Sequence, residues 1–209
     1  MARPIHADAE ATRRRVLDAA SQLFSAKGLA STTMREIASK AGVSMATVHH
    51  YYGGKNDLYE ACVAAMYDEL HTLRSEIQRA VMGASDLRDV VDAAVRQTFH
   101  FSRRHRNAVR LMNRTVLDTG QLDEKRRREF LQPFLEDGGR VLGALLGKPP
   151  EQMRLALLAM NYLIARFVLN SESELKLVTG TAEDAPAEEA IQRVEDFLVS
   201  AALDLFGLR

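Results

Sequence analysis

The chain has 209 residues, of which 46% are hydrophobic and 27% are charged. This length and composition exclude a disordered, collagen-like or low-complexity chain and leave room for one sizeable domain or two small ones. The 28 basic and 28 acidic residues balance, so any attraction to nucleic acid has to be local. Residues 1–55 hold eight basic and four acidic side chains, so the N-terminal quarter is the basic part.

The single cysteine, Cys62, excludes an intrachain disulfide and a multi-cysteine zinc site, which is usual in a reducing cytosol. The first residues lack the apolar h-region that is typical of a signal peptide. The most apolar stretch, Met153–Leu169, contains Arg154, Asn161 and Arg166 and is shorter than the ~20 residues of a membrane span. We therefore expect a cytoplasmic protein with no membrane partner, in which this stretch is a buried helix and Cys62 is a small buried hydrophobic residue.

Helical periodicity dominates the chain, and no stretch alternates β-branched and polar residues over the length of a strand. We therefore expect an all-α chain of about nine helices, without an internal repeat. The first helix carries an apolar stripe from Val16 to Phe24. Gly28 is expected to end this helix in a left-handed C-terminal cap.

Two short helices are expected next. Thr33 and Glu36 have the spacing of a capping box, which predicts the start of the second helix, and Gly42 ends it. Ser44 can cap a third helix of about two turns, which Gly53-Gly54 ends.

The rest of the chain continues the helical pattern. Asn56 is expected to cap a long fourth helix that reaches about Gly83, and a fifth helix follows from Ser85. A seventh segment is expected to be kinked or split near Pro133 and Gly138-Gly139. The other predicted bounds are a polar break at 102–106, a sixth helix over 107–118, the seventh segment over 123–146, an eighth helix over 151–172, a loop over 179–186 and a last helix striped by Ile191, Val194, Phe197, Leu198, Ala201, Ala202 and Leu205.

The turn Ala41-Gly42-Val43-Ser44 between two short helices has the pattern of a helix-turn-helix, whose second helix enters the major groove of DNA. Taken alone the turn is a weak signal, because helical bundles of other functions also join short helices through glycine. The residues around it, however, resemble the N-terminal signature of the tetracycline-repressor (TetR) family of transcriptional regulators. The residues that carry the resemblance are Leu23, Phe24, Gly28, Thr32, Thr33, Ile37, Ala38, Ala41, Gly42, Val43, Ser44, Tyr51, Tyr52 and Lys55.

The resemblance implies a DNA-binding domain over residues 1–56 and a helical ligand-binding and dimerisation domain over 57–209. It implies a repressor that binds a pseudo-palindromic double-stranded operator as a homodimer and is released by a small-molecule effector. The apolar residues expected around the pocket favour a small hydrophobic effector, and no metal or cofactor is expected.

The family likeness also assigns roles to residues. Thr33, at a helix N-terminus, and Lys55 are expected to bind phosphates. His49 stands where the family usually has tyrosine. The third helix lacks an arginine, so a guanine contact is left to Arg35 or to the N-terminal arm. The predicted DNA-binding residues are Thr33, Arg35, Ser44, Met45, Ala46, Thr47, His49, His50, Tyr51 and Lys55, with Val48 and Tyr52 packed inward.

The eighth helix is apolar nearly all round and has more apolar surface than one chain can cover, so we expect it to form the dimer interface with the last helix. The predicted interface residues are Ala156, Ala159, Tyr162, Leu163, Phe197, Ala201 and Ala202. An effector pocket is expected beside the fourth helix. Its predicted residues are Met66, Leu70, Phe99, Met112, Phe134, Asn161 and Arg166. A filled core is the alternative for the pocket, and a subunit boundary is the alternative for Asn161 and Arg166.

Other functions have less support. The chain shows no nucleophile motif, no metal-ligand spacing and no phosphate loop, so an enzyme is disfavoured. A helical ligand-binding or scaffold protein that keeps this fold without binding DNA stays open as the alternative. The run Arg13-Arg14-Arg15 either contacts phosphates or is a solvated helix face, and the solvated face is favoured.

Overall fold

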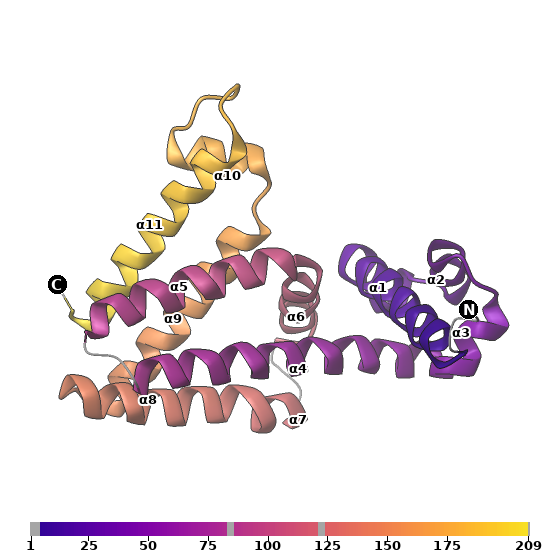
Figure 1. Cartoon of the computed structure of the whole chain (residues 1–209), viewed down its shortest axis with the longest axis horizontal. Coiled ribbons are helices and arrows are strands. Elements are labelled where there is room, and N and C mark those ends of the chain that lie inside the picture. Colours follow the sequence, from indigo (N-terminus) through magenta and orange to yellow (C-terminus); the bar gives the residue numbers. More distant parts are fainter. Residues whose placement is uncertain (1–4, 83–85, 121–123, 209) are drawn as a thin grey trace. The chain divides into compact units, whose positions relative to one another are not determined.

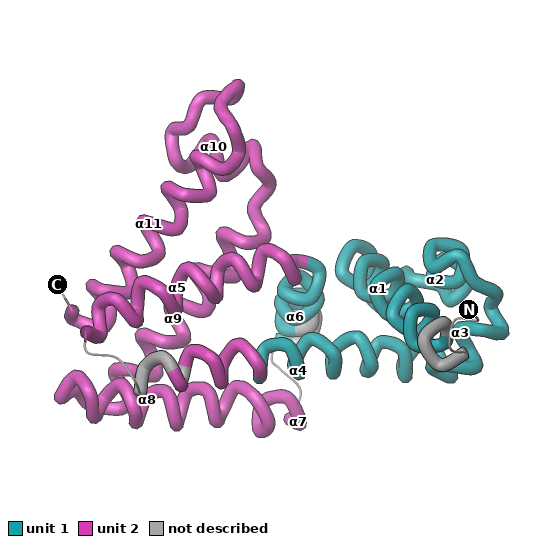
Figure 2. Tube along the Cα trace, viewed as in Figure 1, with its two compact units in different colours: residues 1–71, 107–121 teal, residues 72–106, 122–209 magenta. Residues whose placement is uncertain are grey.

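The computed structural model describes residues 5–82, 86–120 and 124–208, and every regular element in these ranges is a helix (Figure 1). The prediction of an all-α chain is therefore confirmed. Two compact units are distinguished, residues 1–71 with 107–121 and residues 72–106 with 122–209 (Figure 2). This division follows compactness, whereas the functional division after residue 56 stays a prediction.

The first unit contains the N-terminal helices and one later helix. Its helices are α1 (Ile5–Ser31), α2 (Met34–Ala41), α3 (Met45–Tyr52), the first part of α4 (Lys55–Met82) and most of α6 (Arg106–Thr119). The second unit is built from the remaining elements. These are the end of α4, α5 (Leu87–Arg104), α7 (Glu124–Arg126), the π-helical turn η1 (Arg127–Leu131), α8 (Gln132–Leu146), α9 (Pro150–Leu169), α10 (Glu172–Thr179) and α11 (Ala187–Phe206).

The core of the first unit is made by the apolar stripes that the sequence predicts. Phe24 of α1, Ile37 of α2, Val48 of α3 and Leu58 of α4 are fully buried. Burial of each such side chain contributes about 1.5–3 kcal/mol relative to leaving it exposed, so these four contacts hold the short α2 and α3 in place. Cys62 is also buried, and this burial raises the pKa of its thiol to about 11, as expected of a structural rather than a reactive cysteine.

The break in α1 lies at the predicted residue but has a different conformation. Gly28 has φ 82° and ψ 167°, an extended backbone with positive φ that is essentially restricted to glycine, rather than the expected left-handed cap. The carbonyl of Gly28 accepts a hydrogen bond of 2.8 Å from the Thr32 hydroxyl. The chain then makes one more turn to Ser31 before α2 begins.

In the second unit, α8 packs closely along α9, while α11 packs against α5, α9 and α10. Gly138 and Gly139 do not kink α8, contrary to the prediction. Gly139 instead permits a close approach, because a Cβ atom there would lie 2.8 Å from the Pro150 carbonyl oxygen. The predicted split occurs earlier, where η1 lies just before Pro133, whose ring conflicts with the carbonyl four residues before it.

Three further details differ from the sequence prediction. The fourth helix begins at Lys55 rather than after a cap at Asn56, and the Asp57 carboxylate accepts a hydrogen bond of 2.9 Å from the Gly54 N–H. The pattern also missed α10, which begins with a capping box of Ser171 and Glu174. The predicted positions Gly83, Ser85 and Asp123 lie outside the described residues.

Candidate nucleic-acid interface

The helix-turn-helix is formed by α2, a tight turn and α3. Thr33 caps α2 with both reciprocal hydrogen bonds of the predicted capping box. Gly42 is left-handed, with φ 67° and ψ 39°, and the Val43 N–H donates to the Ala38 carbonyl over 3.0 Å. Ser44 then starts α3 by accepting a hydrogen bond of 3.0 Å from the Thr47 N–H. Local capping chemistry therefore fixes where both helices begin and how sharply the chain turns between them.

The orientation of α3 is set by its inner face. Val48 is fully buried, and the Tyr52 hydroxyl donates a hydrogen bond of 2.9 Å to the Arg13 carbonyl in α1. The Arg13 guanidinium lies over the Tyr52 ring, 5.9 Å from its centroid. Partial burial raises the pKa of Tyr52, so its hydroxyl remains a donor at neutral pH. These contacts leave the opposite face of α3 toward solvent.

All ten predicted DNA-binding residues belong to the first unit, and none of them is buried. Met45, Ala46, His49 and His50 of α3 are exposed. Thr47 is half-buried, and its hydroxyl lies 2.8 Å from the Ser44 hydroxyl. The structure thus gathers polar and apolar contact groups on the outer face of one short helix.

The two histidines of this face have different surroundings. His49 Nδ1 lies 2.7 Å from the Gly53 carbonyl oxygen, so its ring is held toward the C-terminal end of α3. The His50 ring is in edge contact with Tyr51, with 5.2 Å between ring centroids. His49 is therefore anchored to the backbone of its own helix end, whereas His50 packs on a neighbouring aromatic ring.

The predicted phosphate site at Thr33 is occupied by a side chain of the protein itself. The Thr33 N–H donates to Glu36 Oε2 over 2.9 Å, and the Thr33 hydroxyl lies 3.0 Å from the same oxygen. A hydrogen bond from Lys27, followed by those from Thr33, lowers the pKa of Glu36 to about 2, so this carboxylate is ionised at neutral pH. The Thr33 N–H and hydroxyl are thus engaged by Glu36 in this structure, and a phosphate contact at Thr33 stays a prediction.

Lys55 and Arg35 lie on the same unit but are held differently. The Lys55 ammonium donates a hydrogen bond of 3.3 Å to the Ala30 carbonyl, just before α2, and Arg35 is exposed. Arg13 is a residue whose structural role the sequence analysis did not identify, because a contact with Tyr52, distant in sequence, leaves no local signal. Arg14 and Arg15 are exposed on α1, as expected of a solvated helix face.

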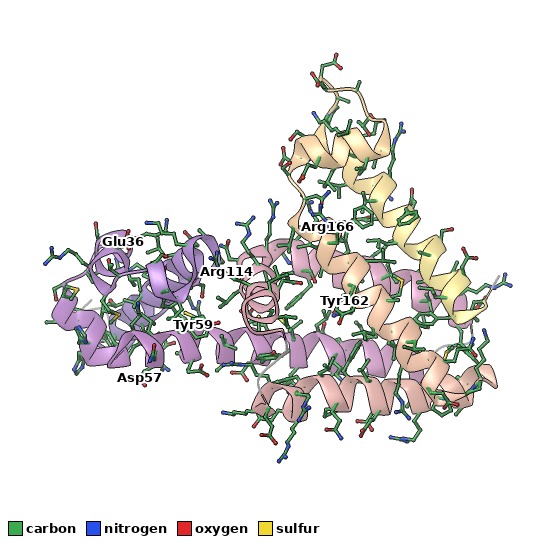
Figure 3. The ribbon with its side chains drawn as sticks, turned by 180° about the vertical axis from the view of Figure 1, so that it is seen from behind. Glu36, Asp57, Tyr59, Arg114, Tyr162 and Arg166 are labelled. Atoms are coloured by element: carbon green, nitrogen blue, oxygen red, sulfur yellow. The ribbon has the colours of Figure 1, made fainter. Side chains whose placement is uncertain are left out.

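The predicted effector residues are divided between the two units. Met66, Leu70 and Met112 belong to the first unit, and Phe99, Phe134, Asn161 and Arg166 to the second. Met66 and Phe99 are buried, and Leu70, Met112 and Phe134 are half-buried. Asn161 and Arg166 are exposed on α9, where Figure 3 labels Arg166. The Arg166 guanidinium donates a hydrogen bond to the Asn170 side-chain oxygen. The pocket that joins these residues stays a prediction.

The predicted dimer residues fall into exposed and buried groups. Tyr162 of α9, labelled in Figure 3, is 60% exposed, and Phe197 of α11 is 52% exposed. Ala156 and Ala202 are buried within their own unit, while Ala159, Leu163 and Ala201 are half-buried. The stretch that forms α9 was expected to be a buried helix with more apolar surface than one chain can cover, and part of that surface is open in the structure, at Leu155 and Tyr162. Pro150–Leu169 is long and apolar enough to span a membrane, and 28% of its most apolar 18-residue stretch is buried. This is weak evidence for a membrane location, because core helices can have the same length and composition.

Comparison with known proteins places the resemblance in the same N-terminal region. Residues 16–62 match the family model described as bacterial regulatory proteins, tetR family. The HTH-type transcriptional regulator SrpR of Pseudomonas putida is 42% identical over 65 residues, covering 31% of this chain and 30% of that protein. The probable HTH-type transcriptional regulator YttP of Bacillus subtilis is 29% identical over 128 residues, covering 59% and 58%. The chain thus spans less than two thirds of the length of these curated relatives.

Solved structures extend the likeness to the whole fold. A TetR-like transcriptional regulator from Rhodococcus sp. RHA1 is similar with a TM-score of 0.62 and 21% identity, over 91% of this chain and 93% of that one. The fatty acid degradation regulator FadR from Bacillus halodurans is similar with a TM-score of 0.57 and 18% identity, over 90% and 94%. Identities this low establish a shared helical fold and no more.

Proposed function

We propose that this chain, which belongs to the tetR family of bacterial regulatory proteins through residues 16–62, is a sequence-specific DNA-binding transcriptional repressor. The observation that carries the proposal is the way in which α3 packs against the rest of its unit. Its inner side is held by Val48 and Tyr52, so the exposed side with Met45, Ala46 and His50 is free to enter a major groove.

A selection from random double-stranded DNA, followed by a mobility-shift assay with the enriched duplex, tests this function. Thr47→Ala is expected to change the preferred bases at a cost of about 1–3 kcal/mol for a direct contact. His71→Ala, which changes an exposed residue of α4 in the same unit, is the control and is expected to leave the preference unchanged. Enrichment of no sequence would favour the scaffold alternative, and an unaltered preference in Thr47→Ala would remove Thr47 from the reading face.

We further propose that the chain acts as a homodimer through α9 and α11, which suits a pseudo-palindromic operator. The support is the apolar surface that each chain leaves open on both helices, and the contact between the Phe167 and Phe197 rings, 5.7 Å apart, that joins them. Ala159, Leu163 and Ala201 are the proposed small and flanking residues of this surface.

Sedimentation of variants tests the dimer. Tyr162→Arg combined with Phe197→Arg is expected to give helical monomers that no longer shift DNA. Leu177→Arg is the matched control, because Leu177 of α10 is 80% exposed and lies outside the proposed surface. A dimer that survives the double change would place the interface elsewhere. Ala202→Arg is a poor test, since this residue is fully buried and arginine there would disrupt the core.

We also propose that a medium-sized, mostly hydrophobic effector releases the DNA. An effector acts only if it binds the two states of the protein with different affinities, so its site must connect with an element that reaches the DNA-binding helices. The support is that α4 continues from α3, and that α6 belongs to the same compact unit as α1. Within that unit the Ser25 hydroxyl donates to Asn107 over 3.2 Å, and Arg114 lies against Gly28 (Figure 3).

A thermal-shift screen of small hydrophobic compounds tests the effector. Leu70→Trp is expected to abolish or mimic release from DNA while leaving the dimer intact. A compound whose affinity is unchanged in Leu70→Trp would show that the site lies elsewhere, and the absence of any binder would favour the effector-independent alternative.

A further inference from the structure

The position of the His49 ring determines which of its nitrogens carries hydrogen. Nδ1 lies 2.7 Å from the carbonyl oxygen of Gly53, within hydrogen-bond distance. A carbonyl oxygen only accepts hydrogen bonds, so Nδ1 has to be the donor. His49 as a residue is exposed, so its other nitrogen, Nε2, is the one considered for a contact with DNA.

This arrangement constrains what His49 can bind. In a neutral imidazole one nitrogen is a donor and the other an acceptor, so with Nδ1 protonated Nε2 carries no hydrogen. Phosphate diester oxygens also only accept hydrogen bonds. Neutral His49 therefore has nothing to donate to a DNA phosphate, whereas the protonated ring donates from Nε2 and carries a positive charge while keeping its bond to Gly53.

The place of His49 in α3 favours the phosphate backbone over base edges. In helix-turn-helix proteins the N-terminal residues of the recognition helix contact bases, and in α3 those are the residues from Met45 to Thr47. His49 lies one turn later, with its ring drawn toward the C-terminal end of the helix by Gly53. A side chain that leaves the groove at this end approaches the sugar–phosphate strand.

We propose that His49 is a phosphate-binding residue that takes up a proton when the chain binds DNA. This inference rests on the proposed DNA-binding function and deepens it. The step is balanced: neutral His49, a solvent proton and a DNA phosphate give an imidazolium whose Nε2–H donates to the phosphate oxygen. Binding is then linked to pH, with at most one proton taken up at this residue for each chain bound.

A pH dependence of DNA binding has to be assigned among the ionisable groups on α3 and on the elements around it. On α3 itself these are His50, Tyr51 and Tyr52. The elements packed against α3 or continuing from it contribute Arg13 of α1, Arg35, Glu36 and Lys40 of α2, and Lys55 and Asp57 of α4. Of the two carboxylates, Asp57 accepts a hydrogen bond from the Gly54 N–H and Glu36 accepts one from the Thr33 N–H. His50 is the other histidine of this set, and it provides the matched control.

The experiment measures the affinity of the full-length protein for two duplexes of equal length between about pH 6 and about pH 8 at constant salt, the range in which histidine changes charge. One duplex is the sequence enriched from a random pool, and the other is unrelated. The wild-type affinity for both is expected to fall with rising pH, by up to about tenfold per pH unit for each chain bound. His49→Gln is expected to flatten this dependence, and His50→Gln to keep it.

His49→Tyr is the rescue variant. A phenol hydroxyl donates to phosphate without titrating below about pH 10, so this variant is expected to bind with little pH dependence and to retain affinity at about pH 8. Thermal unfolding of each variant checks that α3 stays folded. Nitrogen-15 NMR of the free protein gives a readout that needs no DNA, because neutral His49 is expected to carry its hydrogen on Nδ1.

The outcomes separate this inference from the proposed function. A chain that binds neither duplex at any pH contradicts the DNA-binding function itself. Binding that is independent of pH, or a pH dependence that survives in His49→Gln and disappears in His50→Gln, overturns the inference for His49 alone. A neutral His49 ring with its hydrogen on Nε2 also overturns it, because such a ring can donate to phosphate without taking up a proton.

Discussion

Replacing Gly28 by alanine tests how the end of α1 is held in place. Gly28 has φ 82° and ψ 167°, and a Cβ atom there would lie 2.8 Å from Nε and 3.0 Å from Cζ of Arg114 in α6. Alanine therefore meets two obstacles, a backbone conformation that side chains rarely adopt and a guanidinium in the space that the methyl group needs. The guanidinium ends a flexible side chain and can move away, so backbone strain is the larger cost.

The magnitude follows from three contributions. Backbone strain of this kind costs about 1–3 kcal/mol. Displacement of Arg114 adds about 1 kcal/mol, the typical net value of one polar contact. Alanine also lowers the conformational entropy of the unfolded chain relative to glycine, which stabilises the folded state by about 0.4–1 kcal/mol. We expect Gly28→Ala to lower the free energy of unfolding by about 2 kcal/mol, which corresponds to a melting temperature about 4–8 °C lower for a chain of this size.

Urea denaturation and thermal melting followed by circular dichroism measure this change. Gly42→Ala is the control in the same unit, because Gly42 is left-handed but no atom lies within 4 Å of the place that an alanine methyl group would take there. For this control we expect about 1 kcal/mol, because left-handed strain of about 1–2 kcal/mol is partly offset by the same effect of alanine on the unfolded chain. If Gly28→Ala costs no more than Gly42→Ala, neither the extended conformation at Gly28 nor its contact with Arg114 contributes as argued.

Two further predictions concern charged residues of the same unit. Lys55→Ala is expected to weaken binding to all duplexes about equally and to reduce the slope of log affinity against log salt by about one, whereas Lys125→Ala leaves the slope unchanged. A loss confined to one duplex would contradict a phosphate contact at Lys55. Because the pKa of Glu36 lies at about 2 in the folded chain, below its ordinary 4.5, its contribution to stability is present above about pH 4.5 and is lost as the pH falls toward 2. Acid unfolding should therefore depend less on pH in Glu36→Gln than in the wild type, and identical curves would contradict this role.

The sequence by itself predicted the features that local chemistry controls. The capping boxes, the glycine turns and the apolar stripes are short-range patterns, because each is satisfied by residues a few positions apart. Thr33 with Glu36, Ser44 and Gly42 therefore have the predicted caps and turn. The burial of Phe24 and Val48 follows from the same periodicity. The family likeness and the candidate DNA face also came from this N-terminal stretch, of which residues 16–62 match the model of that family.

The sequence left the structural role open where a residue type can serve more than one purpose. Glycine in a helix indicates either a kink or a close contact, and only the position of Pro150 shows that Gly139 serves the second purpose. The eighth predicted helix was expected to have more apolar surface than one chain can cover, and Tyr162 is exposed on α9. What covers this surface stays a prediction.

The tertiary structure decided which polar groups meet. Arg13 reaches Tyr52 and Arg114 reaches Gly28 across long sequence separations, and no local pattern encodes such pairs. The sequence identified His49 as an unusual residue on the reading face, but only its distance to the Gly53 carbonyl assigns a hydrogen to Nδ1. Periodicity and capping act over a few residues and can be read from the chain, whereas the direction in which a side chain can donate a hydrogen bond depends on the atoms that folding brings beside it.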